Sequence, residues 1–178
     1  MKKLVGLTLL VFGVSVRGWA ATGVAEVMGT APNSHVSGMV QFEDTAGGLK
    51  VNASLANVPP GQHAFHIHEF GSCADTGKAA GSHYNPMSAP HGQVLKEGIA
   101  HAHAGDLGNV TAGQDGKATL EAVIPGLSLA SGSYTVAGRA VILHEKVDDF
   151  SQPVGNAGGR IGCGPIVLIG SAAPPSKK

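Results

Sequence analysis

The sequence predicts an all-β protein whose antiparallel strands form a sandwich or a barrel. Short segments of β-branched or alternating apolar and polar residues recur along the chain, which is the pattern of half-buried strands. Turn signals separate these segments, and the 27 glycines among 178 residues favour tight turns over helices. Short strands at such spacing are typical of antiparallel sandwiches and barrels.

Three strands are expected in the first half of the chain. Residues 36–42 (VSGMVQF) and 49–55 (LKVNASL) place apolar or small residues at alternate positions, and a TAGG turn at 45–48 joins them. Residues 64–68 (AFHIH) follow the proline- and glycine-rich turn at 59–61 and form the third strand.

Three further strands are expected in the second half. Residues 118–124 (ATLEAVI) alternate in polarity and follow an Asp-Gly turn signal at 115–116. Residues 134–143 (YTVAGRAVIL) and 161–169 (IGCGPIVLI) are rich in β-branched and other apolar residues, which favours strands.

Two long stretches, residues 69–109 and 144–160, contain no expected strand. Loops of this length in a compact domain are usually functional or disordered. These two hold or directly adjoin nearly all of the nine histidines, so we expect both loops to be functional.

The first 20 residues have the pattern of a signal peptide. Lys2 and Lys3 precede an uncharged, largely apolar run at 4–16, and small residues follow where cleavage is expected. The run is too short to span a bilayer comfortably. A buried N-terminal strand or helix is the alternative.

The predicted domain spans residues 21–170, and residues 171–178 (SAAPPSKK) are expected to form a disordered tail. Removal of the first 20 residues takes away three of the 12 basic residues, so 9 remain against 12 acidic ones and the net charge is −3. Such a chain has no basic stripe for nucleic acid and no polybasic cluster for a membrane surface. We therefore expect a periplasmic or secreted protein that binds neither.

Cys73 and Cys163 are the chain's two cysteines. In an exported protein, a single pair favours one disulfide. A metal-binding pair is the alternative, but no C-x-x-C spacing supports it.

His66 and His68 are the first candidate metal ligands, because residues i and i+2 of a strand share a face and can converge on one cation. Imidazole suits copper and zinc, and a carboxylate among imidazoles suits zinc. A solvated histidine-rich loop that binds metals weakly is the alternative, although such loops tend to be runs of contiguous histidine. The further candidate ligands are His83, His91, His103, Asp106 and His144.

Five segments hold these residues in order: AFHIHEFG at 64–71, GSHYNP at 81–86, HAGDLGN at 103–109, LHEKVDD at 143–149 and GNAGGRIGCG at 155–164. Together they resemble the copper/zinc superoxide dismutases, and the likeness runs from about residue 24 to 169. The resemblance implies an eight-stranded Greek-key β-barrel or flattened sandwich with two long functional loops. It also implies an enzyme that disproportionates superoxide to oxygen and hydrogen peroxide, with copper and zinc ions as cofactors.

The resemblance assigns a role to each candidate residue. It implies copper ligands at His66, His68, His83 and His144. It implies zinc ligands at His83, His91, His103 and Asp106. The imidazolate of His83 then bridges the copper centre to a structural zinc.

Three further roles follow from the same resemblance. Asp148 is the carboxylate that orients His66 and His91 without binding metal. Arg160 lies beside the open copper position, where it holds the anionic substrate through charge-assisted hydrogen bonds. The two cysteines form a disulfide between the first long loop and the last strand.

The spacing around the first cysteine departs from the eukaryotic pattern in the manner of bacterial secreted members. One residue separates Gly71 from Cys73, and nine separate Cys73 from His83. The segment between Asp149 and Arg160 carries no charge, so long-range attraction of superoxide must arise elsewhere. We expect Lys78 to steer the anion, and an ordinary solvated lysine is the alternative.

The other three histidines are expected to have no role at the metals. His63 has the opposite strand parity from His66 and is expected to make structural hydrogen bonds, while His35 is expected to be exposed. His101 could compete for zinc with His103, but the H-x-G-D spacing favours His103.

Superoxide is therefore the expected substrate of a monomer or homodimer. A non-enzymatic metal buffer or binding module of the same fold is one alternative, and an immunoglobulin-like adhesion domain is another. A degenerate relative should have lost a copper ligand or the arginine, and an adhesion domain needs no such set of histidines. The complete ligand set and Arg160 thus favour the enzyme.

Overall fold

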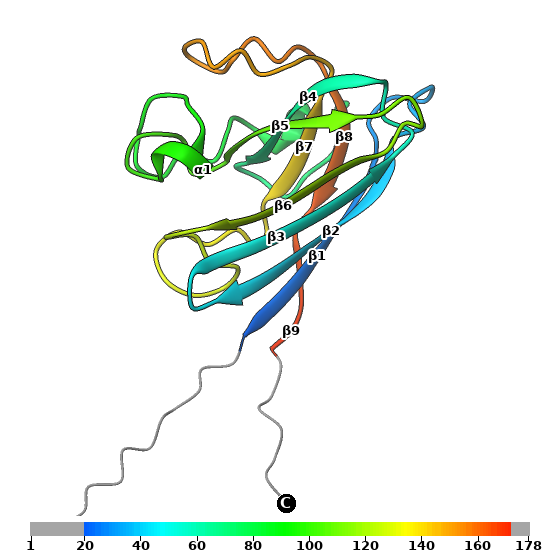
Figure 1. The fold of residues 1–178 in the computed structure, drawn as a ribbon. Coiled ribbons are helices and arrows are strands. Elements are labelled where there is room, and N and C mark those ends of the chain that lie inside the picture. The colour runs from blue at the N-terminus through cyan, green and yellow to red at the C-terminus, as the bar shows by residue number, and fades with distance from the viewer. Residues whose placement is uncertain (1–19, 172–178) are drawn as a thin grey trace, which may run out of the picture.

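The structure, a computed structural model, describes residues 20–171 as a set of strands with long connecting loops (Figure 1). The strands are β1 (Ala21–Gly29), β2 (Ser37–Thr45), β3 (Gly48–Ala56), β4 (Gly61–His68), β5 (Asp106–Ala112), β6 (Ala118–Ile124), β7 (Ala140–His144), β8 (Arg160–Pro165) and β9 (Val167–Ser171). Two short helical turns, η1 (Lys78–Ala80) and α1 (Val94–Glu97), lie in the first long loop. Within the described residues, no helix is long and apolar enough to cross a membrane.

One antiparallel sheet contains all of these strands, in the order β5-β4-β7-β8-β1-β2-β3-β6, while β9 pairs with the start of β1. The edge strands β5 and β6 also contact one another, so the sheet curls into a nearly closed barrel (Figure 1). The expected all-β Greek-key barrel is confirmed. The last strand, β9, ends at Ser171, one residue beyond the expected end of the domain. The rest of the predicted tail lies outside the described residues, and so does the predicted signal peptide up to residue 19.

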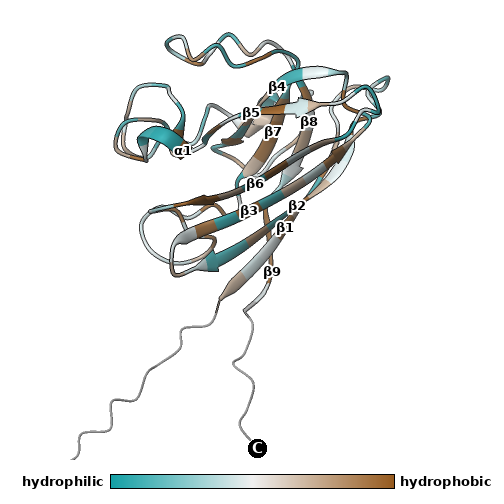
Figure 2. Ribbon diagram, viewed as in Figure 1, coloured by the Kyte–Doolittle hydropathy of each residue, from teal (hydrophilic) through white to brown (hydrophobic). Residues whose placement is uncertain are grey.

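Alternating polarity decides which face of each strand enters the core. Phe42 of β2 and Leu49 and Val51 of β3 are at most 2 % exposed, while the residues between them lie at the surface or partly buried. Figure 2 shows the resulting alternation of apolar and polar residues along β2 and β3. Burying a large apolar side chain contributes about 1.5–3 kcal/mol, so this pattern fixes the register of the sheet.

Five strands differ from the sequence prediction. β1 and β5 were not expected as strands, and β5 occupies the last four residues of the stretch at 69–109 that was expected to contain none. β7 covers only the end of the expected strand at 134–143, because Gly138 has a φ of +80° and turns the chain just before it. The expected strand at 161–169 divides into β8 and β9 after Pro165, which lacks the N–H that a continuous ladder needs.

Candidate metal centre

Two neighbouring strands bring His66, His68 and His144 together. His66 and His68 lie on β4, which pairs with β7 so that Phe65 faces Leu143, and His144 ends β7. All three imidazoles are buried, with exposed fractions of 0 %, 1 % and 5 %. An isolated bridge between His68 and His83 places the fourth histidine beside them.

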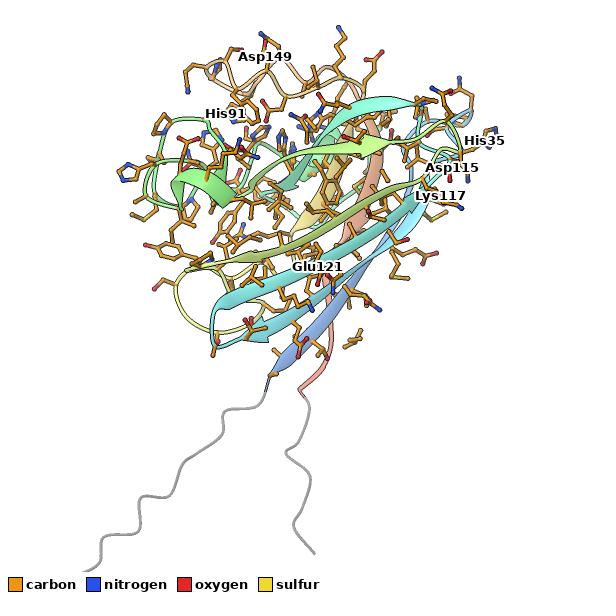
Figure 3. The ribbon with its side chains drawn as sticks, viewed as in Figure 1. His35, His91, Asp115, Lys117, Glu121 and Asp149 are labelled. Atoms are coloured by element: carbon orange, nitrogen blue, oxygen red, sulfur yellow. A yellow bond between two sulfur atoms is a disulfide. The ribbon has the colours of Figure 1, made fainter. Side chains whose placement is uncertain are left out.

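The structure gathers the candidate ligands into two groups, in each of which the potential ligand atoms lie within 4.8 Å of one another. The first group is His66, His68, His83 and His144. The second group is His83, His91, His103 and Asp106. His83 belongs to both groups, and every member is buried. Figure 3 shows the labelled His91 of the second group beneath the loop that carries the labelled Asp149.

Hydrogen bonds to groups outside the cluster leave one ring nitrogen of His66 and one of His68 unused. Nε2 of His66 donates to Oδ2 of Asp148 at 2.8 Å, and Nδ1 of His68 donates to the carbonyl of Gly81 at 3.0 Å. The remaining nitrogens face inward: Nε2 of His68 lies 3.3 Å from Nε2 of His144. Nδ1 of His66 is buried without a hydrogen-bond partner. Nitrogen lone pairs that converge in this way suit a bound cation such as copper.

Asp106 is the centre of the second group. Its Oδ1 lies 2.8 Å from Nδ1 of His83 and 3.2 Å from Nδ1 of His103, and its Oδ2 lies 2.8 Å from Nδ1 of His91. Nδ1 of His91 nevertheless makes no aligned hydrogen bond. These separations approach the edge of a tetrahedron of ligands around zinc, about 3.3 Å for Zn–N bonds of about 2.0 Å. The second group therefore fits zinc.

Asp148 connects the two groups. Its Oδ2 accepts from His66 of the first group, and its Oδ1 accepts from Nε2 of His91 in the second group at 2.9 Å. The side chain of Asn109 on β5 fixes the backbone of Asp148, accepting from its N–H at 2.7 Å and donating to its carbonyl at 2.9 Å. A carboxylate held in this way orients the imidazoles on either side.

Burial keeps three imidazoles of the first group, those of His68, His83 and His144, in the form that binds a cation. Burial, together with neighbouring histidines, lowers the pKa of His68 to about 2 and that of His144 to about 3. Burial also lowers the pKa of His83 to about 4, although its hydrogen bond to Asp106 opposes the shift. At neutral pH these rings are uncharged, and an uncharged imidazole is the form that binds a metal.

The two carboxylates have the opposite effect on their neighbours. Burial alone would raise the carboxyl pKa values, but hydrogen bonds from histidines hold the pKa of Asp106 and of Asp148 well below their usual range. Burial also opposes protonation of His91, yet its contacts with both carboxylates raise its pKa to about 9. Asp106 is therefore ionised at neutral pH and favours a cation, which would replace the proton that the two carboxylates hold on His91.

A pocket at the surface opens onto the first group. It is lined by His68, Ser82, His83, His144, Val154, Asn156, Ala157, Gly158 and Arg160. The guanidinium of Arg160 donates to the carbonyls of Gly77 at 2.5 Å and Gly81 at 2.6 Å. Burial lowers the pKa of Arg160, but arginine keeps its charge at physiological pH.

The predicted disulfide is confirmed. Cys73 and Cys163 are joined with a Cα–Cα distance of 5.7 Å, so the alternative of a metal-binding pair is wrong. The bond ties the first long loop to β8, three residues beyond Arg160.

The other three histidines and Lys78 lie outside the two groups. His63 is buried and its ring nitrogens lie 2.9 Å from the carbonyl of His144 and 2.8 Å from that of Pro59, as expected of a structural histidine. His35 and His101 are exposed, and His101 belongs to neither group. Lys78 is exposed on η1.

Two contacts of the centre were not anticipated from the sequence. Asn109 stands inside the HAGDLGN segment, and its position three residues after Asp106 was the available signal. Gln152 contacts the backbone of His91, and nothing in its surroundings in the sequence marks it.

The comparisons with known proteins agree with this geometry. A family model described as "Copper/zinc superoxide dismutase (SODC)" matches residues 36–166. "Superoxide dismutase [Cu-Zn] 3" of Arabidopsis thaliana is 39 % identical over 150 residues, which are 80 % of this chain and 89 % of that protein. "Extracellular superoxide dismutase [Cu-Zn]" of Caenorhabditis elegans is 39 % identical over 139 residues, which are 74 % of this chain and 61 % of that protein. The chain belongs to the copper/zinc superoxide dismutase family, whose reaction is the disproportionation of superoxide with copper and zinc as cofactors.

Proposed function

We propose that the two groups are the copper and zinc sites of an exported superoxide dismutase. His66, His68, His83 and His144 hold copper, and His83, His91, His103 and Asp106 hold zinc. The observation that carries this proposal is the membership of His83 in both groups, since one imidazole with two nitrogens can serve two cations. The unpartnered Nδ1 atoms of His66 and His91 support it as well.

Bound copper supplies the one-electron oxidation of one superoxide and the one-electron reduction of a second. The chain's own residues bind and orient the reactants. Nδ1 of His83 faces Asp106, so its Nε2 remains for the copper side. The protons that hydrogen peroxide needs would come from water, directly or by way of this nitrogen when it is not bound to copper. Asp148 holds the rings of His66 and His91 through their Nε2 atoms and so fixes which nitrogen of each is left for metal.

Arg160 is the proposed substrate-binding residue. It lines the pocket together with three of the four proposed copper ligands. Two N–H groups of its guanidinium donate to loop carbonyls, which fixes its position and leaves other N–H groups for an anion. A charge-assisted hydrogen bond to superoxide then places the anion beside the copper position.

The proposed place of action is outside the cytoplasm. The disulfide supports it, because such bonds persist in oxidising compartments. The extracellular relative supports export in general, and the signal-peptide pattern at 1–20 together with the spacing around Cys73 supports a bacterial periplasmic or secreted protein. We propose that it acts there as a monomer or homodimer, free of membrane and nucleic acid.

Replacement of His83 tests the proposal. The purified protein should contain copper and zinc, remove superoxide, and change its copper absorption spectrum when zinc is extracted. In His83→Ala, activity should fall and zinc extraction should no longer alter the copper spectrum, because the link between the groups is gone. His101→Ala is the matched control and should behave as the parent. Full activity and an unaltered spectral response in His83→Ala would show the bridge assignment to be wrong.

A further inference from the structure

His91 is held at three points by one short stretch of the loop between β7 and β8. Oδ1 of Asp148 accepts from Nε2 of its ring at 2.9 Å. The ring of Phe150 lies nearly parallel to that of His91, at an interplanar angle of 21° and with 6.5 Å between centroids. The side chain of Gln152 contacts its backbone. Asp148 and Phe150 therefore contact the ring of His91, and Gln152 binds its backbone.

The contact between Gln152 and His91 has two hydrogen bonds. The N–H of His91 donates to Oε1 of Gln152 at 3.0 Å, and Nε2 of Gln152 donates to the carbonyl of His91 at 2.8 Å. One side-chain amide thus satisfies both polar groups of one residue, as a neighbouring strand would do. His91 has no strand beside it, because it lies in the long loop between β4 and β5. Gln152 therefore makes the two backbone hydrogen bonds that a neighbouring strand would otherwise make.

We propose that Gln152 is a positioning residue for the zinc site, through its hold on the backbone of His91. The inference rests on the proposed assignment of His91 to zinc. Asp148 can orient the ring only if the backbone of His91 stays where the ring can reach both Asp148 and Asp106. The two bonds of Gln152 fix that position. They also fasten the loop that carries Val154 and Asn156, which line the pocket beside Arg160, to the zinc site.

Gln152→Leu removes both hydrogen bonds and shortens the side chain by one atom. Zinc release to a chromogenic chelator should be about 10-fold faster than in the parent, at the lower end of the effect of residues that orient metal ligands. The visible spectrum of cobalt bound in place of zinc should change, because it reports the ligand geometry. Gln152→Glu keeps the acceptor for the His91 N–H but loses the donor, so its release rate should be intermediate. Gln114→Leu, in the turn between β5 and β6, is the matched control and should release zinc as the parent does.

A double-mutant cycle distinguishes positioning from a general effect on folding. If Gln152 acts on the same histidine as Asp148, Gln152→Leu should add little to the zinc release rate of Asp148→Asn. Amide hydrogen exchange at His91 should quicken in Gln152→Leu, while exchange in β2 and β3 should not. Unchanged zinc release in Gln152→Leu, or equal acceleration of zinc and copper release, would overturn the inference. His91→Ala tests the assignment beneath it: zinc retained in that variant would refute the proposed zinc site itself.

Discussion

Gly155 occupies a point in the centre where no side chain fits. A Cβ atom there would lie 1.8 Å from Oδ1 of Asp148 and 2.6 Å from Nε2 of His91, and its φ of +73° already disfavours other residues. Its backbone N–H donates to the carbonyl of Ser151 at 2.8 Å, which keeps it in place. The bond between Asp148 and His91 therefore depends on a residue that touches no metal.

Gly155→Ala should weaken zinc binding by about 10–100-fold, as the loss of a residue that orients a ligand does. The added methyl group must displace the carboxylate of Asp148, so the defect should match that of Asp148→Asn. Zinc affinity can be measured by competition with a chelator. Gly116→Ala is the control, because Gly116 has the same φ of +73° but lies in the turn between β5 and β6. Equal zinc affinity in the two alanine variants would contradict the expectation.

The sequence indicated which residues gather into the two groups, but not the residues that hold them in place. His66 and His68 were candidates because alternation on a strand places both on one face, and Asp106 because its segment resembles that of the family. Gln152 acts through backbone atoms of a residue 61 positions away. Nothing in the sequence distinguishes it from any other polar residue in a loop. Contacts of this kind depend on the tertiary fold alone.

At the scale of elements, β5 shows why one strand could not be foreseen. Its sequence DLGNVTA contains aspartate, glycine and asparagine, which are depleted in strands. It is a strand because it pairs with β4, where Gly61 faces Ala112 and His66 faces Asp106. The register shifts between Ala64 and His66. This irregularity lies where the regular pairing of the barrel ends and the residues of the metal centre begin. Alternating segments such as β3 were predictable since their burial follows from local pattern.

The disulfide and Arg160 form one structural unit with the first loop. Cys163 lies on β8 with Arg160, and Cys73 holds the loop whose carbonyls at Gly77 and Gly81 accept from the guanidinium. The carbonyl of Gly81 also accepts from His68, so one peptide group positions both the arginine and a proposed copper ligand. The disulfide therefore fixes the geometry of the pocket as well as the fold.

Thiol titration of the denatured, non-reduced protein should find no free thiol. The double variant Cys73→Ser, Cys163→Ser should lose roughly 2–5 kcal/mol of unfolding free energy, which denaturant titration measures. Its second-order rate with superoxide should fall at conditions where it remains folded, because the carbonyls that hold Arg160 are no longer tied to β8. A folded double variant with the parent's rate would show that the loop keeps its shape without the bond.

At the scale of the whole molecule, the net charge of −3 expected after removal of the first 20 residues repels an anionic substrate. Lys78 is exposed on η1, next to Gly77 whose carbonyl accepts from Arg160. We propose that Lys78 attracts superoxide from a distance while Arg160 binds it at contact. The two roles should differ in how the rate depends on salt. Screening acts over about 8–10 Å at ordinary ionic strength, so salt weakens attraction from a distance more than binding at contact.

Lys78→Ser should lower the second-order rate at low salt and flatten its dependence on ionic strength. Arg160→Ser should lower the rate at every salt concentration, because its contact with the anion is lost. Lys96→Ser is the control for a change of net charge, since Lys96 is also exposed but lies on α1. Rate-versus-salt curves of Lys78→Ser and Lys96→Ser that coincide would leave Lys78 as an ordinary surface lysine.

The pairing of β9 with β1 has a consequence for how the polypeptide can be cut and rejoined. Ala21 faces Ser171 in that pairing, and both ends leave the barrel at the end opposite the loop between β7 and β8 (Figure 1). A short linker could therefore connect the two ends, and new termini could be opened in the turn between β5 and β6, none of whose residues belongs to either group. A carrier joined at Ala21 or Ser171 would leave the barrel on the side away from the loop between β7 and β8, which contributes to the pocket beside Arg160. The barrel thus presents its reactive end and its attachment end as separate surfaces.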